Sequence, residues 1–128
     1  MAWFNEQQNR LAIERRAIAQ SFPQMEFFLK ANQLYVRGAI HTGYGKTYDL
    51  IILYPDTYPY EAPKVFSGTP LKANTPHRFR DGSLCVHYNE WSPSYTVIVA
   101  IGWAAHWFHA YDAWVQTGDW PGKEVSHG

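Results

Sequence analysis

The stretch "QLYVRGAIHTGYGKTYDLIILYP", residues 33 to 55, holds two runs rich in β-branched and aromatic residues on either side of a Gly-Tyr-Gly turn signal. A third run of this kind, "MEFFLKA", covers residues 25 to 31 and is joined to the first by a short polar link. Links this short favour hairpins, because parallel neighbours need a crossover of about a dozen residues or more. The three runs therefore predict an antiparallel meander.

The residues before the meander predict a helix from about residue 5 to residue 22. Asn5 with Gln8 three positions later resembles a capping box, and Pro23 ends the pattern. Apolar residues recur between them near helical spacing, at Leu11, Ala17, Ile18 and Phe22.

After residue 54 the chain becomes irregular. Prolines at 55, 59 and 63 exclude a helix or a central strand for most of "YPDTYPYEAPKVF", although residues 64 to 66 could form a short edge strand. Residues 67 to 95 lack periodicity and contain several Gly and Pro residues, so we expect a long ordered loop there. A loop of this length inside a compact domain is usually functional.

A second helix is predicted from residue 93 or 96 to residue 117. Ser92 or Ser94 could cap its start, and Gly118 could lie past its last turn. We interpret its aromatic stripe as facing the core rather than as a ligand site; the stripe consists of Trp103, Trp107, Tyr111 and Trp114. Together these elements predict an α+β fold in one domain, residues 1–128, with residues 119–128 as a flexible tail.

The composition limits the classes of partner. Eleven basic residues balance eleven acidic ones, which leaves no long-range field to attract nucleic acid or an anionic membrane. No apolar run is long enough for a membrane span. The single cysteine, Cys85, cannot form an intrachain disulfide, and the N-terminus has no signal-peptide pattern. These features favour a cytoplasmic location.

Cys85 lies in the polar loop with His77 eight residues before it and His87 two residues after it. A lone cysteine is most often a small buried hydrophobic residue. Loops, however, carry chemistry more often than packing. A free thiol has a pKa near 8.5, so a neighbouring imidazolium or a set of backbone amides would be needed to raise its thiolate fraction.

Three chemistries could use such a site. A zinc site could combine Cys85, His77 and His87 with one of two further histidines, His106 or His109, although the close ligand pairs of structural zinc sites are missing. A papain-like hydrolase usually has its cysteine at the start of a helix, which "VHYNEW" does not suggest. Acyl transfer through a thioester needs only an exposed cysteine and donors for the oxyanion.

The order of three segments resembles the ubiquitin-conjugating enzyme family. These segments are "YPDTYPYEAPKVF", "TPHRFRDGSLC" and "WSPSYT", starting at residues 54, 75 and 91. The family has a Tyr-Pro-x-x-Pro-Pro segment, a His-Pro-Asn motif ending eight residues before the catalytic cysteine, a Gly-x-x-Cys turn and a Trp-Ser-Pro before its second helix. The likeness covers residues 5 to about 117 and implies a four-stranded antiparallel meander between helices.

The resemblance implies roles for single residues. Cys85 would carry the C-terminal acyl group of a ubiquitin-like modifier as a thioester. Pro76 and His77 stand where the family has Pro and Asn, so His77 would support the oxyanion through a ring N–H. His87 stands where several members place an acidic residue, and it could act as the base for the attacking amine. Trp91 is expected to pack under the loop.

The chain also departs from the family, because the Asn is replaced by His77 and the sequence stops without the two helices that usually finish the fold. These features resemble the truncated bacterial members found in antiphage (CBASS-like) operons beside a cGAS-like cyclic-nucleotide synthase. The resemblance implies that the acyl group comes from a ubiquitin-like modifier or from the C-terminus of such a synthase, with an activating enzyme as a further possible partner. It implies no cofactor.

Two alternatives remain open from the sequence. One is a catalytically inactive binding module of the same fold, against which the presence of Cys85 argues. The other is a small zinc-binding domain.

Overall fold

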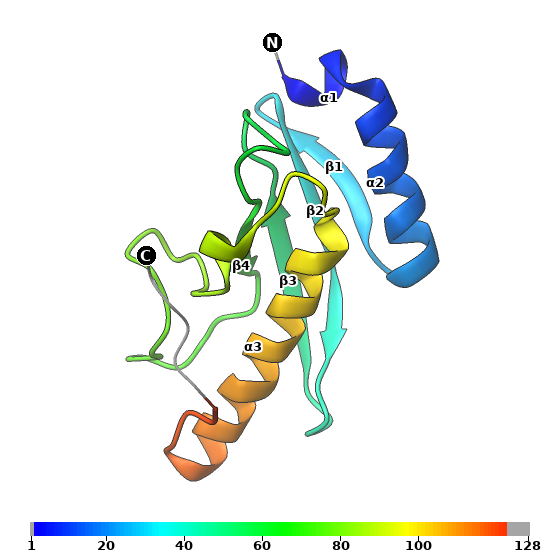
Figure 1. Ribbon diagram of the computed structural model, residues 1–128. Helices are drawn as coiled ribbons and strands as arrows, with labels where there is room; N and C mark the ends of the chain where they lie inside the picture. Colours follow the sequence, from blue (N-terminus) through cyan, green and yellow to red (C-terminus); the bar gives the residue numbers. More distant parts are fainter. Residues whose placement is uncertain (1, 123–128) are drawn as a thin grey trace.

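The structure is a computed structural model that describes residues 2–122. An antiparallel sheet of four strands, in the order β1-β2-β3-β4, forms its centre (Figure 1). The strands cover Glu26–Lys30 in β1, Gln33–His41 in β2, Thr47–Leu53 in β3 and Lys64–Ser67 in β4. The predicted meander and the predicted edge strand are therefore confirmed.

The N-terminal helix is broken into α1, Trp3–Glu6, and α2, Gln8–Ser21. The predicted capping box is wrong, because Asn5 lies inside α1 and α2 has no side-chain cap. The break lets Trp3 reach the core, where its ring is buried 5.1 Å from the ring of Tyr54 and 4.8 Å from that of Tyr58. Burial of the Trp3 ring therefore outweighs the local sequence preference for one continuous helix.

The second predicted helix is α3, Val97–Thr117. Gly118 follows it in the left-handed conformation, at φ 84°, and donates to the carbonyl of Trp114 at 2.8 Å, so its predicted position is confirmed. The predicted serine caps are wrong, because the hydroxyls of Ser92 and Ser94 bond to each other at 2.9 Å.

One face of the sheet is covered by α3, as Figure 1 shows. The sheet contributes fully buried side chains from three strands: Val36, Leu50, Ile52 and Val65. The helix contributes a complementary set of small and apolar side chains: Ala100, Ile101, Ala104 and Phe108. Alternation along β3 places every second residue inward, as expected for a sheet with one buried face.

The aromatic stripe of α3 differs in part from the expectation. Trp107 and Tyr111 are buried, whereas Trp103 and Trp114 are only half-buried. The indole of Trp107 donates to the carbonyl of His77 at 3.0 Å, and the hydroxyl of Tyr111 accepts from a loop amide. The stripe therefore packs against the loop after β4 as well as against the core.

Candidate functional site

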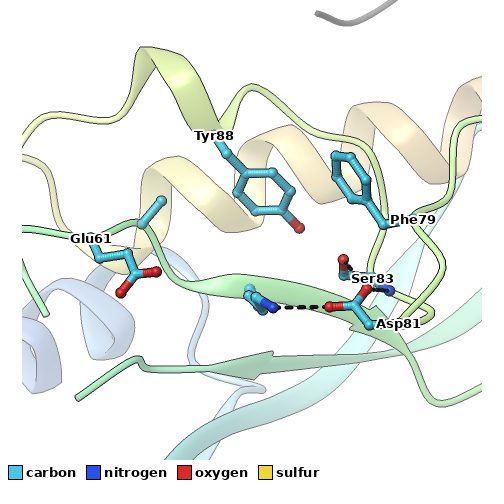
Figure 2. A pocket seen from close by; sticks show the side chains of 7 residues that line it. Glu61, Phe79, Asp81, Ser83 and Tyr88 are labelled. Carbon is cyan, nitrogen blue, oxygen red and sulfur yellow. Dashed lines mark hydrogen bonds and ion pairs between the residues drawn. The ribbon is translucent and has the colours of Figure 1, made fainter. Parts of the chain in front are cut away.

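The loop between β4 and α3 contains a tight turn just before Cys85. Asp81 accepts from the amide of Ser83 at 2.9 Å and from its hydroxyl at 2.6 Å. Phe79 and Ser83 are joined by a backbone bond of 2.8 Å, and Gly82 adopts φ 91°, which favours glycine. Lys64 of β4 holds Asp81 by an ion pair of 2.9 Å (Figure 2).

The backbone fixes Cys85 in place. Its amide donates to the carbonyl of His77 at 2.9 Å, and the amide of the preceding Leu84 donates to Val65 of β4 at 2.8 Å. The predicted loop position is correct, but the side chain of Cys85 is fully buried instead of exposed. The loop folds back between β4 and α3, so a loop residue becomes an interior one.

Burial raises the pKa of the Cys85 thiol to about 11, and the charge of Asp81 adds to this effect. Asp81 itself stays charged, because hydrogen bonds from Ser83 and the ammonium of Lys64 hold its pKa well below the usual range. At neutral pH only about one Cys85 thiol in ten thousand is then ionised. The structure therefore shows a shielded thiol.

His77 has the left-handed backbone conformation, with φ 58°. This region favours Asn, Asp and His among residues that have a side chain. Its carbonyl accepts from Cys85 and from the indole of Trp107, while its ring lies 4.7 Å from the ring of Trp120. The structure thus brings His77 to Cys85 through the backbone.

His87 lines the same cavity as Cys85. Its Nδ1 atom lies 3.4 Å from the carboxylate of Glu90, and its ring lies 5.8 Å from that of Trp103. The side chain is 37% exposed, so one edge of the imidazole reaches solvent. This position, between the thiol cavity and solvent, suits a proton carrier.

The cavity beside Cys85 has a volume of only about 40 Å³. It is bounded by the loop, by α3 and by the residues just after α3; these are Cys85, Val86, His87, Trp103, His106, Trp107, Ala110, Trp120 and Pro121. The cavity is therefore much smaller than a usual ligand pocket, which has a volume of about 300–1,000 Å³.

Trp120 was not expected to take part in the site, because the sequence assigned it to the tail. Its ring lies 5.2 Å from that of Trp107 and 6.5 Å from that of Trp114. A tryptophan two residues after a helix-ending glycine is the only sequence signal for this contact. Residues 123–128 lie outside the described residues.

A second hollow, of about 410 Å³, lies along the start of β4. Figure 2 shows the rings of Phe79 and Tyr88 on one wall, with Glu61 and Asp81 toward its two ends. The hydroxyl of Tyr88 donates to the carbonyl of Leu84 at 2.8 Å, which fastens the 3-10 turn, Tyr88–Glu90, to the cysteine loop. The contacts around this hollow attach the cysteine loop to β4.

Trp91 and Pro76 do not line the thiol cavity among the described residues. The indole of Trp91 donates to the carbonyl of Pro59 at 2.8 Å, and its ring lies 5.8 Å from that of Tyr58. Trp91 therefore packs under a loop, although the loop is the one between β3 and β4. Pro76 is half-buried and leads into His77.

A buried carboxylate that the sequence did not reveal joins the N-terminal helix to α3. Glu14 is fully buried and accepts from the hydroxyl of Tyr54 and the amide of Val97, each at 2.9 Å. The guanidinium of Arg10 completes the set at 3.0 Å and also donates to the carbonyl of Pro93 at 2.8 Å. An Arg-Glu pair at helical spacing usually indicates a surface ion pair, so the sequence carried no signal for it.

Two further properties of the described residues bear on the alternatives. No group of three or more His, Cys, Asp or Glu side chains between residues 2 and 122 is placed to hold a metal ion, so the zinc-site alternative finds no support there. Within the same residues, no helix has the length and apolar character needed to cross a membrane.

The comparisons with known proteins identify the type of domain. The family described as "Type II CBASS E2 protein" matches residues 14–128. Ubiquitin-conjugating enzyme 15 of Arabidopsis thaliana is 40% identical over 65 residues, which are 48% of this chain and 40% of that enzyme's length.

Solved structures agree on the fold. A ubiquitin-conjugating enzyme from Plasmodium falciparum is similar with a TM-score of 0.59 at 18% identity, over 80% of this chain and 97% of that one. Another from Agrocybe aegerita has a TM-score of 0.56 at 21% identity, over 85% of this chain and 92% of that one. At such identities the likeness concerns the fold alone.

Proposed function

Because the chain belongs to the Type II CBASS E2 family, we propose that it is a conjugating enzyme that carries the C-terminal acyl group of a protein as a thioester on Cys85 and passes it to an amine. The observation that carries the proposal is the position of Cys85. It follows a braced turn and bonds to the carbonyl of His77, in the loop between β4 and α3 of a ubiquitin-conjugating fold.

The proposed reaction has two steps. In the first, the Cys85 sulfur attacks the carbonyl carbon of an activated acyl donor; the carbon–sulfur bond forms, the bond to the leaving group breaks, and the thiol proton leaves with that group or to solvent. In the second, an amine nitrogen attacks the same carbon, loses a proton and expels the Cys85 thiolate. The thioester intermediate divides one difficult transfer into two easier ones.

We assign partners by the same argument. The acyl group comes from a ubiquitin-like modifier or from the C-terminus of a cGAS-like synthase, and an activating enzyme supplies it in reactive form. The proposed setting is antiphage defence in the bacterial cytoplasm. Coexpression with the genes that flank it tests this role: wild type should form covalent conjugates and Cys85→Ala should form none. Equal conjugation by the two proteins would refute it.

The proposed role of His87 is to accept the proton of the attacking amine. A base of this kind adds its own pH dependence to the discharge of a preformed thioester in wild type. His87→Ala should lose this dependence and keep only the steeper one of the amine. His109→Ala is the matched control, because His109 is an exposed histidine of α3 that is absent from the described lining of the cavity. Superimposable profiles for wild type and His87→Ala would remove His87 from the mechanism.

The second candidate is an inactive binding module of the same fold. Its support is the complete burial of Cys85 and the raised pKa of its thiol. Such a module would bind an acyl-donor protein without ever forming a thiol-labile adduct, which distinguishes the two functions.

A further inference from the structure

The described chain closes the approach to its own thiol. Cys85 has no exposed surface, and the cavity beside it holds about 40 Å³. A thioester on Cys85 needs space for an extended peptide backbone and for a carbonyl carbon in contact with the sulfur. The closed arrangement therefore has to change before any acyl group can reach the thiol.

The part of the cavity wall that can move most simply is the segment after α3. Gly118 reverses the chain with φ 84°, and Trp120 then lies against the rings of His77 and Trp107. Among residues 2–122, the backbone of this segment is held by bonds near Gly118: Gly118 bonds to Trp114 at 2.8 Å, and Asp119 bonds to the hydroxyl of Thr117 through its amide at 3.1 Å and its carbonyl at 3.2 Å. Ring packing, which has no directional bond to break, holds Trp120.

The other walls are less free to move. The cysteine loop is tied to β4 through Leu84 and through the Lys64–Asp81 ion pair. On the opposite side, Trp107 belongs to a helix whose inner face is buried against the sheet, and its indole bonds to the loop. A rotation of the segment at Gly118 would leave both of these attachments in place.

We propose that Trp120 is a gate that occupies the binding site of the acyl donor's C-terminal tail, and that the tail takes its place beside Trp107 and His77 when Cys85 is loaded. The identity of the tail as occupant rests on the proposed function, whereas the shielding of Cys85 by Trp120 does not. With Trp120 moved away, the cleft is lined by apolar rings and by the imidazoles of His87 and His106, and no Asp, Glu, Lys or Arg between residues 2 and 122 lines it. Its chemistry fits an extended, uncharged peptide.

The first test measures shielding and needs no acyl donor. Cys85 is the only cysteine, so iodoacetamide labels one site, and the labelling rate of the folded protein reports access to it. Trp120→Ala should be labelled at least about tenfold faster than wild type, and Trp120→Leu should fall between them. Asp119→Ala is the matched control, because it alters the same exposed segment and leaves the Trp120 ring; it should be labelled at the wild-type rate.

Folding is monitored in the same samples by circular dichroism and thermal melting. If Trp120→Ala unfolds, the comparison of Trp120→Leu with wild type decides the question. The gate would be overturned if folded Trp120→Leu and Trp120→Ala were labelled at the wild-type rate. It would also be overturned if folded wild type were labelled as fast as wild type unfolded in urea.

The second test measures displacement with a synthetic, uncharged peptide thioester of 2-mercaptoethanesulfonate. Cys85 takes the acyl group, and the thiol of 2-mercaptoethanesulfonate departs with the proton, so the mass of the protein follows the exchange. Trp120→Ala should acquire the acyl group faster than wild type and Asp119→Ala. Faster labelling with unchanged acyl exchange would overturn the tail as occupant and leave the shielding intact. A different result would refute the proposed function and leave the gate standing. In that case Trp120 shields Cys85, but wild type forms no thioester in the presence of its own partners.

Discussion

The thiol of Cys85 has low reactivity in this structure, because it is buried and its pKa is raised to about 11. Acyl transfer between thiols does not require a strongly acidic thiol, since the incoming acyl group is already activated. A buried, protonated thiol also resists oxidation, because the susceptibility of a cysteine to oxidation rises with its thiolate fraction and its exposure. In the proposed function, shielding protects a cysteine that is needed only when an acyl donor is bound.

The raised pKa of Cys85 predicts how stability depends on pH. An unfolded thiol ionises near pH 8.5, so above that pH the unfolded chain loses a proton that the folded chain keeps. The stabilisation that comes with the protonated buried thiol is complete below about pH 8.5 and is lost as the pH rises toward 11. Over this window wild type should lose up to about 1.4 kcal/mol per pH unit relative to Cys85→Ala. Urea unfolding of both proteins at several pH values measures this difference in stability. Parallel curves would show that burial does not keep the Cys85 thiol protonated in this pH range.

His77 predicts a distinction between two substitutions. The left-handed conformation is tolerated by Asn but costs Ala strain, and Asn also restores the amide donor that the ubiquitin-conjugating family has at this position. Loss of one oxyanion donor typically slows a reaction about 100- to 1000-fold. His77→Ala should slow transfer from the thioester by this order and loading less, while His77→Asn should recover part of the rate. Single-turnover loading and discharge separate the steps, and equal defects in both would assign His77 a structural role.

Among the secondary-structure elements, α2 and α3 are joined by a buried charge. Glu14 satisfies the Tyr54 hydroxyl and the first amide of α3, which has no side-chain cap of its own. Arg10 binds the same carboxylate and also the Tyr95 carbonyl just before α3. The network therefore sets where α3 begins, and α3 carries the wall of the thiol cavity.

Glu14→Ala should destabilise the fold by about 3 kcal/mol or more, because it leaves a buried hydroxyl, a buried amide and a guanidinium without their acceptor. Glu14→Gln keeps an acceptor and should lose less. Glu6→Ala, at an exposed acidic residue of α1, serves as the control. Urea unfolding gives the three values; a loss below about 1 kcal/mol for Glu14→Ala would contradict the role of the network.

The elements that could be predicted from the sequence are those with a strong local signal. Runs rich in β-branched and aromatic residues on either side of a turn signal in residues 33–55 predicted β2 and β3, and Gly118 marked the end of α3. The break at Gln7 and the burial of Glu14 could not be predicted, because both depend on rings of Tyr54 and Tyr58 that are distant in sequence. At the site, the sequence placed His77 and His87 near Cys85 but missed Trp120, whose contacts form only when the chain folds back over the loop.

Across the whole molecule, the sheet and α3 hold one irregular segment between them, the loop that joins β4 to α3. The segment is braced on one side by Lys64 of β4 and on the other by Trp107 of α3. Loops that are held by a rigid scaffold are common sites of chemistry. The family assignment, the fold and the position of Cys85 therefore converge on acyl transfer as the proposed activity.

The most direct test of that activity is the mass of the protein purified under acidic, non-reducing conditions from cells that also express the flanking genes. Wild type should carry a covalent protein adduct that thiols release, and peptide mapping should place it on Cys85. Cys85→Ser should carry an adduct that resists thiols and is cleaved by hydroxide, as expected for an oxygen ester, and Cys85→Ala should carry none. Conjugates formed by wild type without any adduct on Cys85, or an equal adduct on Cys85→Ala, would contradict the thioester mechanism.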